Sequence, residues 1–375
     1  MKHDTLMVHA AARPQPETAA VADSIHLSTT FAHEPDGRRA AAGLEYQREA
    51  HPNAIALEQA LSLVEGGAQT LSFASGMAAI SALMHAIDGP GEVLIGTDVY
   101  QGTRSLCREF LAPRGLMVRE VDHADARAFA AAVTALTRLV WLETPSNPLL
   151  AVGDIALTAL ACKRHGALLV VDNTFASPAL QNPIAHGADV VMHSTTKYLG
   201  GHSDVMGGAL VFARGDAGFE RVAHFRHLHG ALLPPFSAWL TLRGLRTLAV
   251  RIERHAANAA RVAEYLSTRR EVERVNYPGL ANHPNHDVAA RQMRAFGGML
   301  SVQMRGGRDA ALRVAAGVRL FTNATSLGGV ESLIEHRASV EGPAPVTAAN
   351  LLRLSIGLED AEDLIADLAQ ALDAL

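Results

Sequence analysis

Residues 167–201 read ALLVVDNTFASPALQNPIAHGADVVMHSTTKYLGG, and this stretch contains two short apolar runs that each end in polar side chains. The first run ends at Asp172, and the second ends at His193-Ser194, shortly before Lys197. Near-continuous apolar runs of this length are typical of parallel strands buried on both faces of a sheet. Ligands of such sheets bind at the carboxyl ends of the strands, so this stretch predicts both a sheet and the edge that carries its site.

Strand-like runs and helical stretches alternate on both sides of this stretch. An apolar series at helical spacing begins at 54 and stops at Gly66-Gly67. We then expect strands at 70–73, 93–96, 117–121, 138–143 and 208–212, and helices from 76, near 104–110, from 125 and near 155–164. Alternation of this kind predicts an α/β fold in which a mainly parallel, doubly wound sheet is covered by crossover helices.

Composition divides the chain into three parts. Residues 1–52 show no sustained periodicity and contain Pro14, Pro16 and the small-residue stretch 38–43, so we expect an irregular arm. Residues 53–245 form the α/β domain. Residues 246–375 begin with a long helical stretch and then mix the strands expected at 299–304 and 351–357 with the helices expected at 309–316 and 361–372. This mixture is typical of a smaller α+β domain.

The chain has 375 residues, of which 49% are apolar and 19% charged, and its formal net charge is −5. This composition excludes an extended disordered protein, and the mildly acidic balance argues against nucleic acid or an anionic membrane as the main partner. Cys107 and Cys162 are too few for a disulfide framework and indicate a reducing compartment. Without a signal-like stretch or a membrane-length apolar run, we expect a cytoplasmic protein.

Histidine is abundant, which raises the question of a metal site. The densest group is His224, His227 and His229, with His283 and His286 later in the chain. Because of their spacing, the first three cannot all lie on one face of a helix, and no neighbouring Cys or Asp could complete a site with them. We therefore predict no metal site.

Lys197 and Asp172 are the side chains with the clearest chemical potential. An amine at a strand end, flanked by hydroxyls, can lose its proton and attack a carbonyl, which an Arg cannot do. A surface Lys in a polar loop is the alternative. Asp172 directly follows a buried strand, where a carboxylate needs a cationic partner such as a pyridinium nitrogen. For Asp172, the alternative is a cap on the next helix.

The segment 73–79, FASGMAA, leads from an expected strand into an expected helix. Unpaired backbone N–H groups at such a helix start attract a phosphate, here near Gly76 and Met77. The segment matches neither GxGxxG nor the P-loop pattern, so a dinucleotide or nucleoside triphosphate site lacks its fingerprint. Together with Lys197, Asp172 and Tyr100, an aromatic residue that could stack on a ring, it predicts a site for pyridoxal 5′-phosphate (PLP).

A series of motifs runs along the chain from about Leu27 to its end: HLSTTF, EYQREAHPN, FASGMAAIS, DVYQGT, LETPSNPLL, VVDNTFASP, HSTTKYLGGHSDVMGG, LRGLRTLAVRIERHAANA, SLGGVESLIEH and LLRLSIGLED. In these motifs and in their order, the chain resembles the Cys/Met-metabolism family of PLP enzymes. This family contains cystathionine γ-synthases, cystathionine γ- and β-lyases, methionine γ-lyases and homoserine-ester sulfhydrylases. The resemblance implies PLP as the cofactor and the aspartate-aminotransferase-like fold, known as fold type I.

The resemblance also implies roles for individual residues. Lys197 would bind PLP covalently and then carry protons, and Tyr100 would stack on the ring as a second catalytic residue. Other cofactor contacts would come from Asp172, at the ring nitrogen, and from Gly76, Met77, Ser194, Thr196 and Asn147. Tyr46 and Arg48 would reach the phosphate of a neighbouring subunit's cofactor, which implies a homo-oligomer, in this family usually a tetramer built from dimers. Substrate would contact Arg353, Ser326, Asn147 and Glu331.

Three departures from the family's motifs bear on activity. His51-Pro52-Asn53 replaces the usual NPT. After SLIEH the family commonly reads PASMTH, but here Arg337 follows His336 and leads into a shorter loop. Gly102-Thr103 occupies the place where methionine γ-lyases have a nearby Cys, which weighs against a dedicated methionine γ-lyase.

The resemblance favours γ-replacement or γ-elimination on cystathionine or O-acyl-homoserine, as in cystathionine γ-synthases and γ-lyases. The alternatives are cystathionine β-lyase or methionine γ-lyase activity, an aminotransferase-like PLP enzyme, and a catalytically silent binding protein.

Overall fold

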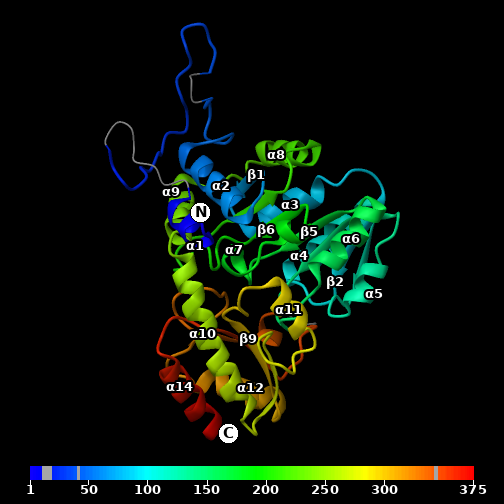
Figure 1. Cartoon of the computed structure of the whole chain (residues 1–375), viewed down its shortest axis with the longest axis vertical. Coiled ribbons are helices and arrows are strands. Elements are labelled where there is room, and N and C mark those ends of the chain that lie inside the picture. The colour runs from blue at the N-terminus through cyan, green and yellow to red at the C-terminus, as the bar shows by residue number, and fades with distance from the viewer. Residues whose placement is uncertain (11–18, 40–42, 342–344) are drawn as a thin grey trace.

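A computed structural model describes residues 1–10, 19–39, 43–341 and 345–375 of the chain. Within these ranges the chain forms two sheets, and Figure 1 places the elements of the larger one above those of the smaller one. Pro14, Pro16 and residues 40–42 of the small-residue stretch lie outside the described residues, as do residues 342–344 of the loop that follows Arg337. In the described ranges, no helix combines the length and the apolar content needed to cross a membrane.

The larger sheet has seven strands in the order β1-β7-β6-β5-β4-β2-β3. Its strands are β1 (Gln69–Phe73), β2 (Gly91–Gly96), β3 (Leu116–Val121), β4 (Thr137–Glu143), β5 (Leu168–Asp172), β6 (Val190–His193) and β7 (Gly208–Phe212). All neighbouring pairs are parallel except those that involve β7. This arrangement confirms the prediction of a mainly parallel α/β sheet. The register pairs Glu143 of β4 with Asp172 of β5, and Asp172 with Met192 of β6, so three carboxyl ends meet at one edge.

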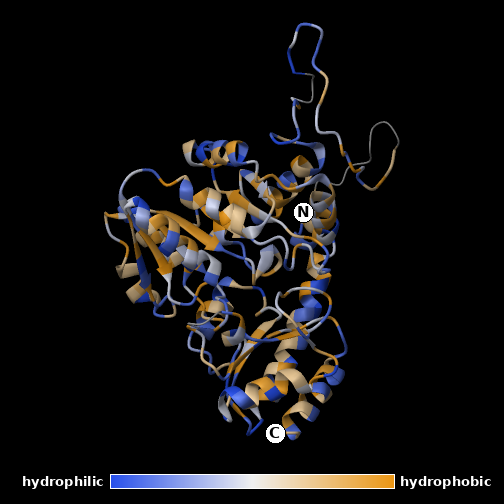
Figure 2. Ribbon diagram, turned by 180° about the vertical axis from the view of Figure 1, so that it is seen from behind, coloured by the Kyte–Doolittle hydropathy of each residue, from blue (hydrophilic) through white to orange (hydrophobic). Residues whose placement is uncertain are grey.

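Helices cover both faces of this sheet. They are α2 (Pro52–Glu65), α3 (Gly76–His85), α4 (Gln101–Leu106), α5 (Ala126–Ala131), α6 (Ile155–His165), α7 (Ser177–Leu180), α8 (Ala217–His229) and α9 (Pro235–Leu245). On β5 the fully buried Leu169 and Val171 belong to one apolar cluster, whereas Val170 belongs to another. Alternate side chains of β5 thus enter separate cores. In Figure 2, strands of the larger sheet are mostly orange, the colour of hydrophobic residues.

Local capping explains how helix α2 begins and ends. Pro52 occupies its first turn, and Nδ1 of His51 accepts a hydrogen bond from the Ala54 amide at 3.1 Å. The other ring nitrogen of His51 donates to the Leu233 carbonyl at 2.8 Å. Gly66 ends the helix with a left-handed φ of 74°. His51 therefore caps the turn at which this chain departs from the family's NPT sequence.

The smaller sheet has the order β10-β11-β12-β9-β8 and is antiparallel except for the pair β10 and β11. Its strands are β8 (Val272–Asn276), β9 (Met299–Met304), β10 (Thr322–Asn323), β11 (Leu333–His336) and β12 (Leu351–Ser355). Its helices are α10 (Leu248–Ser267), α11 (His286–Gln292), α12 (Gly307–Gly317), α13 (Arg337–Val340) and α14 (Ala361–Asp373). Helix α10 runs from the larger sheet toward the smaller one (Figure 1).

The first residues differ from the expectation of an irregular arm. Residues His3–His9 form helix α1, and its Met7 side chain is fully buried among residues of the core. A helix of this length is too short to show a period in sequence, and tertiary packing of Met7 stabilises it. Residues 19–39 remain largely exposed and extend beyond the body of the molecule (Figure 1).

Candidate active site

A cavity of about 260 Å³ opens at the edge where β4, β5 and β6 end. The larger sheet and its loops line it with Ser75, Gly76, Met77, Ile80, Tyr100, Glu143, Asn147, Asp172, Thr174, Phe175, Met192, Ser194, Thr196, Lys197 and Met206. The C-terminal part adds Thr325, Ser326, Leu327, Arg337 and Arg353. The strand ends of one sheet and the side chains of the other therefore enclose a common space.

Lys197 enters this cavity from the loop that follows β6. Its Nζ donates a hydrogen bond to Ser326 Oγ at 2.9 Å. Burial lowers the pKa of Lys197 to about 8, and the positive charge of Arg353 contributes to the shift. A substantial neutral fraction near pH 8 makes this amine a competent nucleophile and base.

Ser326 adopts a φ of 96°, which residues other than glycine rarely adopt. Its carbonyl accepts a hydrogen bond from Arg353 at 3.0 Å, while its hydroxyl accepts from Lys197. Backbone outliers of this kind gather at functional sites, where the surrounding contacts hold them in place.

Asp172 lies at the end of β5 with 6% of its surface exposed. Its Oδ1 accepts the Thr174 amide at 3.0 Å, and among the described residues no cation forms an ion pair with its carboxylate. Burial raises the pKa of Asp172. A buried carboxylate in this state would be stabilised by a cationic partner that enters the cavity.

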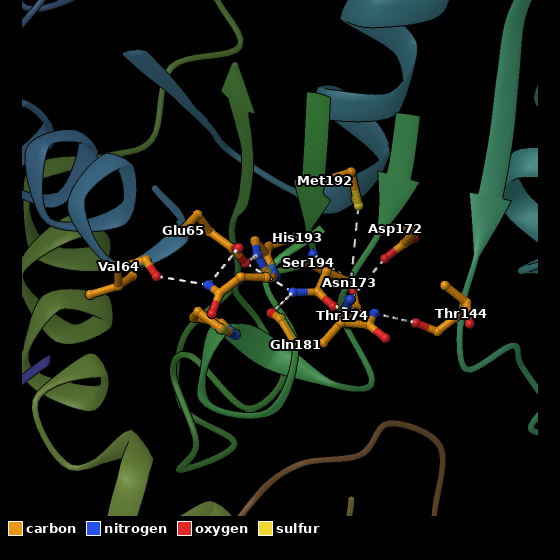
Figure 3. A network of polar contacts seen from close by, with 12 residues as sticks. Val64, Glu65, Thr144, Asp172, Asn173, Thr174, Gln181, Met192, His193 and Ser194 are labelled. Atoms are coloured by element: carbon orange, nitrogen blue, oxygen red, sulfur yellow. Dashed lines mark hydrogen bonds and ion pairs between the residues drawn. The ribbon is translucent and has the colours of Figure 1, made fainter. Parts of the chain in front are cut away.

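A network of buried polar side chains supports this strand end, as Figure 3 shows. Glu65 Oε1 accepts hydrogen bonds from His193 Nε2 at 2.6 Å and from Asn173 Nδ2 at 2.9 Å. Gln181 donates to Asn173 Oδ1 at 2.9 Å and to the Thr144 carbonyl at 3.0 Å. The network joins the end of α2 to the ends of β4, β5 and β6, so it fixes Asn173, which follows Asp172, and His193, which precedes Ser194.

The start of α3 forms another wall. The Ser75 side chain caps the helix by accepting the Ala78 amide at 3.1 Å. A Cβ on Gly76 would lie 3.1 Å from Ser194 Oγ, so glycine allows the helix start to approach the end of β6 closely. Thr196 Oγ1 accepts the Gly207 amide at 3.0 Å, which orients its hydroxyl. The start of α3 and the residues Ser194 and Thr196 therefore line the same cavity, and a helix start offers backbone donors to a phosphate.

Glu143 lies beside these residues, and we did not predict it from sequence. Its Oε2 accepts a hydrogen bond from the Tyr100 amide at 2.8 Å, so Glu143 fixes the backbone of Tyr100, whose ring borders the cavity. Burial, followed by the negative charge of Asp172, raises the pKa of Glu143 well above its usual range. The LETPSNP motif contained this residue, but its pairing with Asp172 became visible only through the register of β4 and β5.

Arg353 projects from the middle of β12 and is 4% exposed. It donates to Asn147 Oδ1 at 3.1 Å and forms an ion pair with Glu335 at 2.6 Å. Burial lowers the pKa of Arg353 to about 10. Glu335 is a further residue that sequence reasoning missed, because it faces Arg353 only through the antiparallel register of β11 and β12.

Three residues of the predicted site lie elsewhere in the described chain. The guanidinium of Arg48 lies 5.6 Å from the ring centre of Tyr46 and donates to the His227 carbonyl at 3.0 Å. Glu331 accepts a hydrogen bond from Ser203 and does not line the cavity. Their roles toward cofactor and substrate stay predictions.

Two of the histidines considered as metal ligands make contacts within the fold. His229 stacks on Phe225 with ring centres 3.8 Å apart, and His283 contacts the Leu150 carbonyl at 3.1 Å. In the part of the chain that the structure describes, no group of three or more His, Cys, Asp or Glu residues is arranged to hold a metal ion.

The cavity residues match the parts of PLP. The start of α3 and the hydroxyls of Ser194 and Thr196 fit a phosphate, and the Asp172 carboxylate fits a ring nitrogen. Lys197, with its lowered pKa, fits an aldehyde. The residues that line the cavity thus offer a partner for the phosphate, the ring nitrogen and the aldehyde of PLP.

Comparison with known proteins agrees with this geometry. The sequence profile of the family described as Cys/Met metabolism PLP-dependent enzyme matches residues 4–373. The chain belongs to this family. It is 49% identical over 374 residues to a cystathionine gamma-synthase of Mycobacterium tuberculosis, covering 98% of this chain and 96% of the relative. It is 40% identical over 384 residues to a cystathionine beta-lyase of Coxiella burnetii, covering 98% of this chain and 97% of the relative.

A solved structure extends the comparison to three dimensions. Cystathionine gamma synthase from Xanthomonas oryzae pv. oryzae, in complex with cystathionine, superposes with a TM-score of 0.94 at 41% identity. The match covers 100% of this chain and 98% of that chain. These findings confirm the family, the fold type I architecture and PLP as the cofactor.

Proposed function

We propose that this chain is a trans-sulfuration enzyme that catalyses γ-replacement, joining an O-acyl-homoserine and cysteine to form cystathionine. The observation that carries the proposal is the 49% identity, over nearly the full length of both chains, with a protein named cystathionine gamma-synthase. The cavity supplies an amine, a buried carboxylate and a buried guanidinium suited to an amino-acid substrate.

Lys197 moves the protons in this proposal. PLP, when bound, supplies a covalent attachment for the substrate amine and an electron sink for charge that develops at Cα. The Lys197 amine would remove the Cα proton, pass that proton on to the bound cofactor and, neutral again, remove a proton at Cβ, so that the γ-substituent leaves with the electron pair of its bond to Cγ. A pKa of about 8 makes proton exchange in both directions accessible near neutral pH.

Arg353 orients the substrate by binding its α-carboxylate. The ion pair with Glu335 and the hydrogen bond to Asn147 fix the guanidinium in one position before substrate arrives. A planar guanidinium can bind both oxygens of a carboxylate, which places Cα within reach of Lys197.

Elimination is a second candidate, because the Coxiella burnetii relative is named cystathionine beta-lyase. Removal of the Cα proton alone releases a β-substituent, whereas removal of the Cα and Cβ protons releases a γ-substituent, and either reaction ends in elimination when no nucleophile is admitted. The nucleophile that the cavity accepts therefore separates synthase from lyase.

The proposal includes a cytoplasmic homo-oligomer, in which dimers share active sites and assemble into a tetramer. Tyr46 is 44% exposed and stands apart from the cavity of its own chain, which supports a role at a neighbouring subunit. Buried Cys107 and Cys162, which form no disulfide, are compatible with a reducing compartment.

A substrate panel tests the proposed activity. Purified holoenzyme is incubated with O-succinyl- or O-acetyl-homoserine plus cysteine, and separately with cystathionine, homocysteine or methionine, and all products are identified. We expect cystathionine from at least one ester. Release of ammonia and a 2-oxo acid from cystathionine, with no cystathionine formed from either ester, would contradict the synthase and favour a lyase.

A further inference from the structure

Arg337 is a second buried arginine at the cavity. It begins α13, directly after β11, and is 6% exposed. It lines the main cavity and also an adjoining cleft of about 300 Å³, whose other walls include Tyr100, Ser105 and Thr325. Its side chain therefore stands between the place where substrate binds and an opening beyond it.

The donors of Arg337 are incompletely used. Its Nη1 donates to Glu335 Oε2 at 3.0 Å, and the same oxygen lies 2.6 Å from Arg353. Its Nη2 lies 3.7 Å from Glu341 Oε1, beyond hydrogen-bonding distance. Its Nε is buried and has no hydrogen-bond partner among the residues that the structure describes. An unpartnered donor of a buried guanidinium is costly unless a ligand supplies the acceptor.

The two acidic neighbours of Arg337 also contact other groups. Glu335 shares Oε2 between two guanidinium groups, and its buried Oε1 has no hydrogen-bond partner among the described residues. Glu341 accepts hydrogen bonds from the backbone amides of Val346 and Thr347 at 2.9 and 3.0 Å, and also from the Thr347 hydroxyl. The cluster thus holds two arginines and two glutamates, and within the described residues the Nε of Arg337 still lacks an acceptor, which an anionic ligand could supply.

Arg337 also occupies a position at which this chain departs from the family's common motif. In the family resemblance, Pro follows the SLIEH sequence, whereas here Arg follows it. Proline offers no cation and no hydrogen-bond donor, so the replacement introduces a new recognition group at the cavity opening.

We propose that Arg337 binds a carboxylate carried on the γ-substituent of the substrate or product, while Arg353 binds the α-carboxylate. This inference rests on the proposed function and names its substrate class as amino acids with a second, distal carboxylate. A succinyl ester carries this group on its leaving part, and cystathionine carries it on its cysteine half. An acetyl ester lacks it.

Equilibrium binding to the holoenzyme tests the recognition without turnover. The probes are L-2-aminosuberate, whose distal carboxylate lies as many bonds from Cα as that of cystathionine, and L-2-aminooctanoate, in which a methyl group replaces that carboxylate. Calorimetry gives the dissociation constants for the parent enzyme and for the Arg337→Gln and Arg337→Lys variants. Arg270→Gln, at an arginine whose side chain is 95% exposed, is the matched control.

In Arg337→Gln, we expect the preference for aminosuberate over aminooctanoate to fall by about 10- to 100-fold, the usual effect of removing a charged hydrogen bond. Arg337→Lys should keep part of the preference, and Arg270→Gln should keep all of it. An unchanged preference in Arg337→Gln would overturn the inference. Equal weakening of both ligands would overturn it as well, because it would indicate α-carboxylate binding or a purely structural role.

Kinetics then identify the source of the distal carboxylate. If Arg337→Gln lowers kcat/KM for the succinyl ester but not for the acetyl ester, Arg337 recognises the leaving group. If it raises KM for cysteine with both esters, Arg337 recognises the cysteine half. Either result supports the inference, and unchanged values for both would contradict it. Failure of the proposed function is a separate result, namely that the parent enzyme makes no cystathionine from either ester.

Discussion

The two sheets contribute to the cavity by different physical means. The larger sheet supplies strand ends and a helix start, so backbone geometry places Asp172, Ser194 and Lys197. The smaller sheet supplies Arg353, whose position depends on side-chain contacts with Glu335 and Asn147. The cofactor side of the cavity is therefore fixed by the fold, whereas the substrate side is fixed by a charge cluster that single substitutions can alter.

The largest effect is expected from the larger sheet, at the amine. Lys197→Ala removes both the covalent attachment and the proton carrier, so we expect turnover to fall by about 10³-fold or more. The visible absorbance of bound cofactor should shift or vanish with it. Lys163→Ala, in the last turn of α6, is the control and should keep both signals. Substantial turnover in Lys197→Ala would contradict the assignment.

On the smaller sheet, Arg353→Leu should weaken substrate use without removing the cofactor. It deletes the guanidinium that we propose binds the α-carboxylate, and it leaves buried Glu335 with Arg337 as its remaining ion-pair partner among the described residues. We expect kcat/KM to fall by about 100- to 1000-fold, mainly through KM. The cofactor absorbance should stay near that of the parent enzyme. Loss of cofactor in this variant would show that the two sides of the cavity are not separable.

The buried network at the strand ends should affect stability more than chemistry. Glu65→Ala removes the acceptor shared by His193 and Asn173, and should lower the free energy of unfolding by about 2–4 kcal/mol. Glu65→Gln keeps an acceptor oxygen and should cost less. Urea denaturation of both variants measures the difference. Equal and negligible effects would show that the network does not support this edge.

The pH dependence of cofactor incorporation links the two sides. Only the neutral amine of Lys197 reacts with an aldehyde, and its pKa is lowered from 10.5 to about 8 by burial and by Arg353. The incorporation rate of apoenzyme should therefore rise with pH below about 8 and level off above it. In Arg353→Leu the nearby positive charge is lost, so the midpoint should move to higher pH. A rate that still rises past pH 9 in the parent enzyme would contradict the lowered pKa.

Sequence patterns predicted most of the larger sheet, because its strands are continuous apolar runs that end in polar residues. The same pattern predicts that Asp172 and Lys197 lie at the carboxyl edge of this sheet, and in the structure both line one cavity. Helix α1 could not be predicted, because its stability comes from the burial of Met7 in the core.

The charged groups of the smaller sheet were harder to predict. Glu335 faces Arg353 only when the antiparallel register of β11 and β12 is known. In the sequence, Arg337 is only a departure from the family's motif after SLIEH. Its burial at the cavity depends on packing between distant segments. Register and tertiary packing, which local patterns do not encode, decide these positions.

The most direct measurement is the location of the cofactor's bond. Holoenzyme is reduced with borohydride, digested and analysed by mass spectrometry, so that the linkage survives as a stable amine. The account predicts that the pyridoxyl group is found on Lys197. Its presence on Lys2 or Lys163, or its absence from every lysine, would contradict the account.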